Sequence, residues 1–162
     1  MISAIVPLTL LGAVVGLDTV SFPQMMLSRP LVAATLGAAM VGSPLEGLLI
    51  GAALELIAHE TLPFGASRDP EWGSASVVAG ALYGSSSAPL AGAMTLALLA
   101  ALATAWVGGW TMVKLRQLNA RWATHARGAL DAGARGTIIG LQLRGITADL
   151  ARGAILTAAA LA

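Results

Sequence analysis

Glu55 is the residue whose type and surroundings are most suited to chemistry. It lies in the apolar run 51–58, which reads GAALELIA. A charged side chain at membrane depth costs about 2.5–3.5 kcal/mol, so such a residue usually faces a cavity or a partner. Its chemistry leaves two interpretations open: a structural ion pair with Arg29 or Arg68, or a hydrogen-bond acceptor for a polyhydroxylated ligand.

Other polar residues near this run could complete a site. His59 lies one turn after Glu55 on the same helical face, which allows a pair between the two side chains. The remaining candidates, which flank the apolar stretch 31–58, are Gln24, Asp69 and Glu71. Each of them also fits ordinary loop chemistry, and a helix cap alone would explain Asp69, which precedes Pro70.

The sequence carries none of the motifs of soluble enzymes. It contains no Gly-rich phosphate-binding loop, no dinucleotide-binding fingerprint and no nucleophile elbow. The pair formed by His59 and Glu60 lacks a second histidine four residues on, which excludes the zinc-protease motif. With no cysteine, a thiolate metal site and a disulfide framework are excluded as well. We therefore predict no catalytic residue, no metal and no cofactor.

The composition predicts an all-α integral membrane protein. Hydrophobic residues make up 57% of the chain and charged residues 10%, with a mean hydropathy of +0.81. A typical soluble domain is about 45–50% apolar and about 25% charged, so this chain lacks the polar surface that a soluble monomer needs. The 19 glycines favour helices that pack closely together.

Breaks in the apolar pattern divide the chain into elements. We expect a membrane domain, a basic segment and the start of a further helix, over residues 1–113, 114–154 and 155–162. Within the membrane domain the expected order is helix 1–17, broken hairpin 31–58, polar loop 59–73 and helices 74–113.

The hairpin is predicted from an interruption at residues 42–44, which read GSP. A serine followed by proline, with Glu46 close behind, is typical of a helix start. The two pieces, 31–41 and 45–58, are roughly 17 and 21 Å long, and the bilayer hydrocarbon is roughly 30 Å thick. Two short tandem segments of this kind indicate a re-entrant hairpin that lines a cavity, with one kinked helix as the alternative.

Charge is divided unevenly along the chain. Residues 1–113 carry two cations and six anions, whereas residues 114–162 carry seven cations and two anions. A basic stretch directly after a long apolar run marks the cytoplasmic side of a membrane protein. We therefore expect residues 114–152 to be cytoplasmic or interfacial, in short amphipathic pieces separated by glycines. Nucleic-acid binding is not expected, because the arginines are spread out and follow a membrane segment.

Three stretches of the sequence resemble one family of membrane proteins. They read RPLVAATLG over 29–37, GLLIGAALELIA over 47–58 and GASRDPE over 65–71. Their order and spacing resemble the pattern of the membrane C subunit of the mannose/sorbose-family sugar phosphotransferase system (PTS). The resemblance runs from residue 17 to residue 84 and continues more weakly over 138–161.

The resemblance implies a multi-pass sugar permease subunit in the bacterial inner membrane. Such a chain would pair with a PTS D subunit, and this C/D pair would form homo-oligomers. It would bind and move a sugar that a cytoplasmic B subunit phosphorylates, supplied in turn by an A subunit, so the chain would not be an enzyme by itself. Carried over residue by residue, the family pattern places Glu55 and Glu71 at sugar-contacting positions, with Gln24 as a further candidate.

Departures from the family pattern support an alternative function. Pro63 stands where asparagine is common, and Gln24 lies two positions earlier than the usual glutamine. The family chain also continues for several helices beyond the point where this sequence ends. The alternative is a non-transporting membrane scaffold or sensor of PTS ancestry in an incomplete phosphotransferase pathway.

Overall fold

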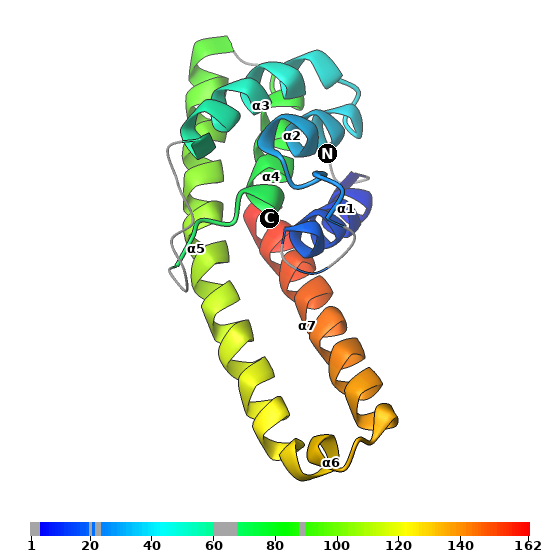
Figure 1. Ribbon diagram of the computed structural model, residues 1–162. Coiled ribbons are helices and arrows are strands. Elements are labelled where there is room, and N and C mark those ends of the chain that lie inside the picture. Colours follow the sequence, from blue (N-terminus) through cyan, green and yellow to red (C-terminus); the bar gives the residue numbers. More distant parts are fainter. Residues whose placement is uncertain (1–3, 20, 22–23, 60–67, 88–89) are drawn as a thin grey trace.

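The computed structural model describes residues 4–19, 21, 24–59, 68–87 and 90–162 (Figure 1). In chain order, the helices are α1 (Ile5–Asp18), α2 (Pro30–Ala39), α3 (Pro44–His59), α4 (Trp72–Gly84), α5 (Leu90–His125), α6 (Arg127–Asp131) and α7 (Arg135–Leu161). No strand occurs within these described ranges. The predicted all-α class is therefore confirmed.

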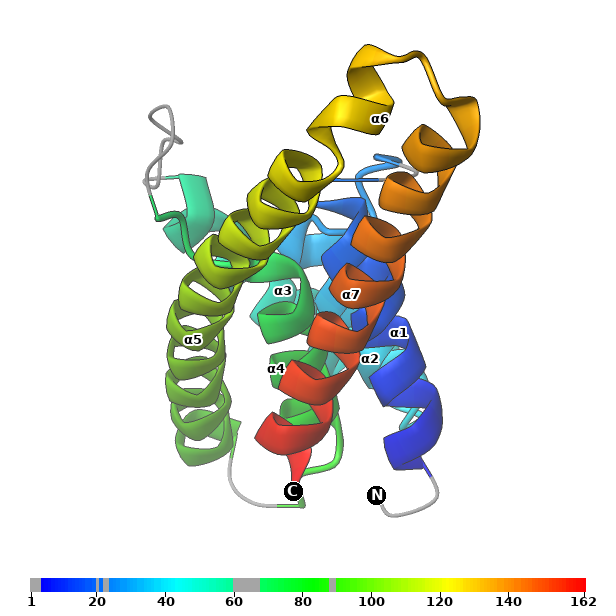
Figure 2. The ribbon, with the colours of Figure 1, turned by 90° about the horizontal axis from the view of Figure 1, so that it is seen from below.

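Helix α4 is the centre of the bundle and packs against α1, α2, α3, α5 and α7 (Figure 2). Every residue from 73 to 81 is buried. Glycines allow this close packing: a Cβ on Gly80 would collide with the carbonyl oxygen of Ala34 in α2. A Cβ on Gly37 would lie 2.6 Å from the carbonyl oxygen of Val77 in α4. The glycine-rich composition thus lets two helix backbones approach each other directly.

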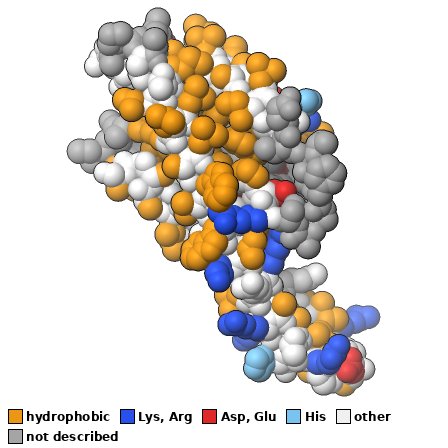
Figure 3. Space-filling view, turned by 90° about the vertical axis from the view of Figure 1, so that its left-hand side faces the viewer, with side chains coloured by type: hydrophobic (Ala, Val, Ile, Leu, Met, Phe, Trp, Pro, Cys, Tyr) orange, Lys and Arg blue, Asp and Glu red, His pale blue; other side chains and the backbone are white. Residues whose placement is uncertain are grey.

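Helix α5 joins the bundle through one face and leaves its other face exposed. The buried face is a stripe of alanines four residues apart, Ala93, Ala97, Ala101 and Ala105, in the core cluster shared with α4. Among the described residues, α5 is the one helix long and apolar enough to cross a membrane, over Gly92–His125. Apolar side chains cover this side of the bundle (Figure 3), and the large ones exposed on α5 include Leu96, Leu99, Trp106 and Val107.

Helices α2 and α3 form an antiparallel hairpin. Gly47 lies against Ala38, whereas Gly51, one turn later, lies against Leu31 at the other end of α2. The chain turns between the helices at Gly42, whose φ is +89°. The predicted interruption is confirmed, and one kinked helix is wrong because the two halves pack side by side. That this hairpin is re-entrant in a membrane stays a prediction.

Helices α5 and α7 extend beyond the bundle as an arm, and α6 joins them at its far end (Figure 1). Helix α5 continues through Val113, the expected end of the membrane domain, without a break. The expected turn among the glycines occurs at Gly133, whose φ is +71°. The elements predicted around residue 113 therefore differ from the observed ones, because one helix carries both the apolar and the basic sequence.

The second half of the basic segment also differs from the prediction. Gly136 and Gly145, two of the glycines expected to separate short pieces, lie inside α7. Residues 155–161 are the end of α7 and not the start of a further helix. An interior glycine costs a helix only about 1 kcal/mol. Burial of the last turns of α7 against α1 and α4, including Leu161, opposes this cost.

Candidate ligand-binding site

Glu55 holds the start of α2 against the end of α3. Its Oε1 accepts a hydrogen bond from Arg29 Nη1 at 2.6 Å, and its Oε2 accepts one from the backbone N–H of Leu31 at 3.2 Å. A carboxylate is favoured there because the first N–H groups of a helix lack partners within it. Of the two ion-pair partners that the sequence suggests, Arg29 is the one observed. Arg68 instead lies over the ring of Trp106, 4.3 Å from its centroid.

Gln24 lies in the connection between α1 and α2, where the backbone is strained. Gln24 is exposed and has a φ of +57°, and Met26 follows with a φ of +63°. Left-handed backbone costs a residue with a side chain roughly 1–2 kcal/mol. Asp18 holds the connection in place, because its Oδ1 accepts the N–H of Met25 at 2.7 Å and its Oδ2 that of Ser28 at 3.0 Å.

Glu71 caps the start of α4 and is only 3% exposed. Its Oε1 accepts a hydrogen bond from the backbone N–H of Ser74 at 3.0 Å. The expected cap, Asp69, is wrong, because the N–H of Glu71 donates to the carbonyl oxygen of Ala105 in α5 and keeps Glu71 extended before the helix. Its second oxygen, Oε2, is buried and has no hydrogen-bond partner among the described residues.

A buried ion pair on α7 was not singled out from the sequence. Arg152 Nε donates to Asp149 Oδ1 at 2.9 Å, and the two side chains are 7% and 4% exposed. Ser21 Oγ donates to the other carboxylate oxygen of Asp149 at 3.2 Å. In the part of the chain that the structure describes, Nη1 and Nη2 of Arg152 are buried without a partner. The available signal was two opposite charges three residues apart, directly before an apolar run.

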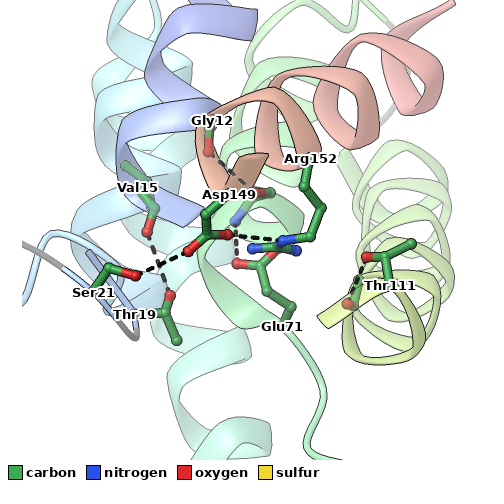
Figure 4. A network of polar contacts seen from close by, with 10 residues as sticks. Gly12, Val15, Thr19, Ser21, Glu71, Thr111, Asp149 and Arg152 are labelled. Atoms are coloured by element: carbon green, nitrogen blue, oxygen red, sulfur yellow. Dashed lines mark hydrogen bonds and ion pairs between the residues drawn. The ribbon is translucent and has the colours of Figure 1, made fainter. Parts of the chain in front are cut away.

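These side chains meet in what we call the α4–α7 polar cluster: Glu71, Ser74, Asp149 and Arg152. The Arg152 guanidinium points toward the Glu71 carboxylate from the opposite helix (Figure 4). Glycines of α1 and α5 border the cluster. A Cβ on Gly16 would lie 3.0 Å from Ser74 Oγ, and one on Gly108 would lie 3.2 Å from Glu71 Oε2. The cluster therefore holds two acids and one base, with charged atoms that no described hydrogen bond satisfies.

The structure does not bring the three predicted site residues into direct contact with one another. Glu55 lies at the α2–α3 hairpin, Glu71 lies in the polar cluster, and Gln24 lies in the connection between α1 and α2. The described contacts contain no pair between Glu55 and His59, and no metal-binding group of acidic or histidine side chains was found among the described residues. Pro63, one of the departures from the family pattern, lies outside the described residues.

Comparison with known proteins identifies one family. The model of the family described as "PTS system sorbose-specific iic component" matches residues 1–162. No curated protein sequence was found to match the chain.

Proposed function

Because the chain belongs to the family of sorbose-specific IIC components of the PTS, we propose that it binds a sugar in the membrane and translocates it while a B subunit phosphorylates it. The family match over residues 1–162 is the observation that carries this proposal. The span-length helix α5 and its exposed apolar face support a place in the membrane. In this proposal the partner subunits transfer the phosphoryl group, so the chain is not itself an enzyme.

We place the sugar contacts at Glu71, Glu55 and Gln24. Glu71 has the strongest support, because its buried Oε2 has no hydrogen-bond partner in the described ranges and a carboxylate oxygen accepts hydroxyl groups well. The oxygens of Glu55 already accept from Arg29 and Leu31, so a sugar hydroxyl would have to share or replace these bonds. Gln24 is exposed, and its amide can both donate to a hydroxyl and accept from one.

The proposed setting is the bacterial inner membrane, with the arm of α5, α6 and α7 on the cytoplasmic side. The arm carries the basic part of the sequence, and cytoplasmic segments of membrane proteins are rich in such residues. Lys114 Nζ lies 5.5 Å from the ring centroid of Trp110, an arrangement that suits the membrane interface. The proposed partners are a D subunit in the membrane, B and A subunits at the arm, and further copies of the C/D pair.

A sugar-uptake assay tests the proposal. The chain is co-expressed with a D subunit and a B subunit in cells that lack their own mannose-type PTS, and uptake of labelled L-sorbose, D-mannose and D-fructose is measured. Loss of one hydrogen bond to a charged group costs about 1.5–3 kcal/mol, so Glu71→Gln should raise the KM roughly 10–100-fold. Glu46→Gln is the matched control, because Glu46 lies in the first turn of α3.

Each outcome of this assay has a separate meaning. Unchanged uptake by Glu71→Gln contradicts the placement of the sugar at Glu71 but leaves the permease function standing. If the wild-type chain takes up none of the sugars but still retains the B subunit at the membrane, it acts as a scaffold or sensor, and the permease proposal is wrong.

A further inference from the structure

Two adjoining hollows lie between α5 and α7 in the arm. The first has a volume of about 640 Å³, and its walls include Leu115, Ile139 and Ile146. The second has a volume of about 420 Å³, and its walls include His125 and Arg144. Both are lined by Trp122 and Leu141, so they adjoin each other along the arm.

We propose that these two hollows bind one anionic phospholipid, with an acyl chain in the first hollow and the phosphate in the second. This inference does not depend on which sugar, if any, the protein transports. It concerns a surface that none of the predicted sugar contacts lines.

The first hollow has the character of an acyl-chain site. Ile139 and Leu143 line it, yet these large apolar side chains are 56% and 57% exposed. Burying a side chain of this size stabilises a complex by about 1.5–3 kcal/mol, so an apolar occupant gains by covering them. Polar side chains line it as well: Ser21 and Asp149 bond to each other at the end toward the bundle, and Arg116, Asn119 and Gln142 also belong to its walls.

The second hollow has the character of a headgroup site. Arg144 is exposed and forms no ion pair among the described residues, so its charge remains for a ligand. His125 Nδ1 donates to the carbonyl oxygen of Arg121 at 2.8 Å, so in the neutral imidazole Nε2 is an acceptor and the positive charge for a phosphate comes from Arg144. No acidic residue lines this hollow in the described part of the chain. Its charge therefore complements a phosphate.

The order of the hollows along the arm fits a lipid in a membrane leaflet. The apolar hollow contains Met112 and Leu115, next to the apolar part of α5, whereas the basic hollow lies further out, toward α6. A phospholipid has the same polarity, because its acyl chains enter the hydrocarbon and its phosphate faces the interface. Basic pockets between helices on the cytoplasmic side are known binding places for anionic headgroups.

A lipid-binding titration tests the inference with the full-length chain in detergent. The probes are phosphatidylglycerol with brominated acyl chains, phosphatidylcholine with the same chains, and inorganic phosphate. Bromine quenches nearby tryptophan, and Trp122 lines both hollows. The quenching that disappears in Trp122→Phe therefore reports occupation of this place. We expect phosphatidylglycerol to quench at lower concentrations than phosphatidylcholine, and phosphate alone neither to quench nor to compete at the lipid's concentration.

Two arginines of the arm provide the matched variants. Arg144→Gln should weaken phosphatidylglycerol binding about fivefold, the effect of one basic residue near an anionic lipid. Arg121→Gln removes the same charge from an exposed position on α5 that lines neither hollow, and should leave binding unchanged. Ile139→Ser should weaken both lipids equally. All three positions are exposed, and far-UV circular dichroism checks that the variants stay helical.

Four results would overturn the inference. The first is equal binding of the two phospholipids, which would leave an apolar occupant without a headgroup site. The second is an Arg144→Gln variant that binds like the Arg121→Gln variant. The third is competition by inorganic phosphate as effective as that of the lipid. The fourth is the absence of any quenching through Trp122. A positive lipid result with no sugar uptake would contradict the proposed function alone.

Discussion

Replacement of Asp149 by alanine is expected to destabilise the protein strongly. The Asp149 carboxylate accepts the Nε–H of Arg152 at 2.9 Å, and the arginine side chain is only 7% exposed. Without this acceptor, the buried guanidinium keeps no hydrogen-bond partner among the described residues. Breaking a buried ion pair by removing one partner costs about 3–5 kcal/mol. For a chain of this length each kcal/mol lowers the melting temperature by about 2–4 °C, so we expect a decrease of roughly 6–20 °C.

A second substitution separates the loss of the pair from the loss of packing. Arg152→Met removes the charge and keeps a long apolar side chain, so Asp149→Ala combined with Arg152→Met should recover part of the lost stability. The recovery is limited because the buried Glu71 carboxylate then loses the guanidinium that faces it. Thermal unfolding in one detergent, followed by circular dichroism, compares the variants with Asp131→Ala, which removes an exposed acid at the end of α6. The reasoning is refuted if the double variant melts below Asp149→Ala, or if Asp149→Ala melts within about 2 °C of the wild type.

Three other contacts have smaller expected effects. Gly108→Ala should be about 1–3 kcal/mol less stable than Gly92→Ala by thermal unfolding, because the new Cβ would lie 2.7 Å from Glu71 Cβ, whereas nothing lies within 4 Å at position 92. Glu55→Gln should cost only about 0.2–1 kcal/mol in denaturant unfolding, because its ion pair is partly exposed. Asp18→Asn should lower the free energy of unfolding by about 1–3 kcal/mol, because one of the two oxygens that accept N–H groups of the connection is lost. It should also speed protease cleavage between α1 and α2, and an unchanged cleavage rate contradicts this expectation.

The break between α2 and α3 could be predicted because its signals are local. Gly42 supplies the left-handed backbone of the turn, and Pro44 is the first residue of α3. The turn at Gly133 depends on the same property of glycine. Such signals act over a few residues and need no knowledge of distant contacts. The all-α class was predictable for a similar reason, since it follows from composition and apolar pattern.

The features that were missed depend on contacts between distant parts of the chain. Pro70 indicates a helix start with Asp69 as its cap, but the hydrogen bond from Glu71 to Ala105 delays the helix and makes Glu71 the cap. An acid and a base three residues apart are usually a surface pair. Asp149 and its partner are buried because α7 packs against α1, α5 and α4. Glu71 could therefore be singled out from the sequence, whereas Arg152, which points toward it, could not.

The described residues of the connection between α1 and α2 contact both Asp149 and Glu55. These contacts affect how the sugar uptake of a Glu55 variant is interpreted. Ser21 bonds to Asp149 on α7, and Arg29 bonds to Glu55 on α3. Loss of Glu55 therefore removes a carboxylate and also frees one end of this connection. Asp18→Asn loosens the same connection and leaves both Glu55 and Asp149 in place. If both variants lower sugar uptake equally, the effect of Glu55 comes from the connection. If only Glu55→Gln lowers uptake, the carboxylate itself is required.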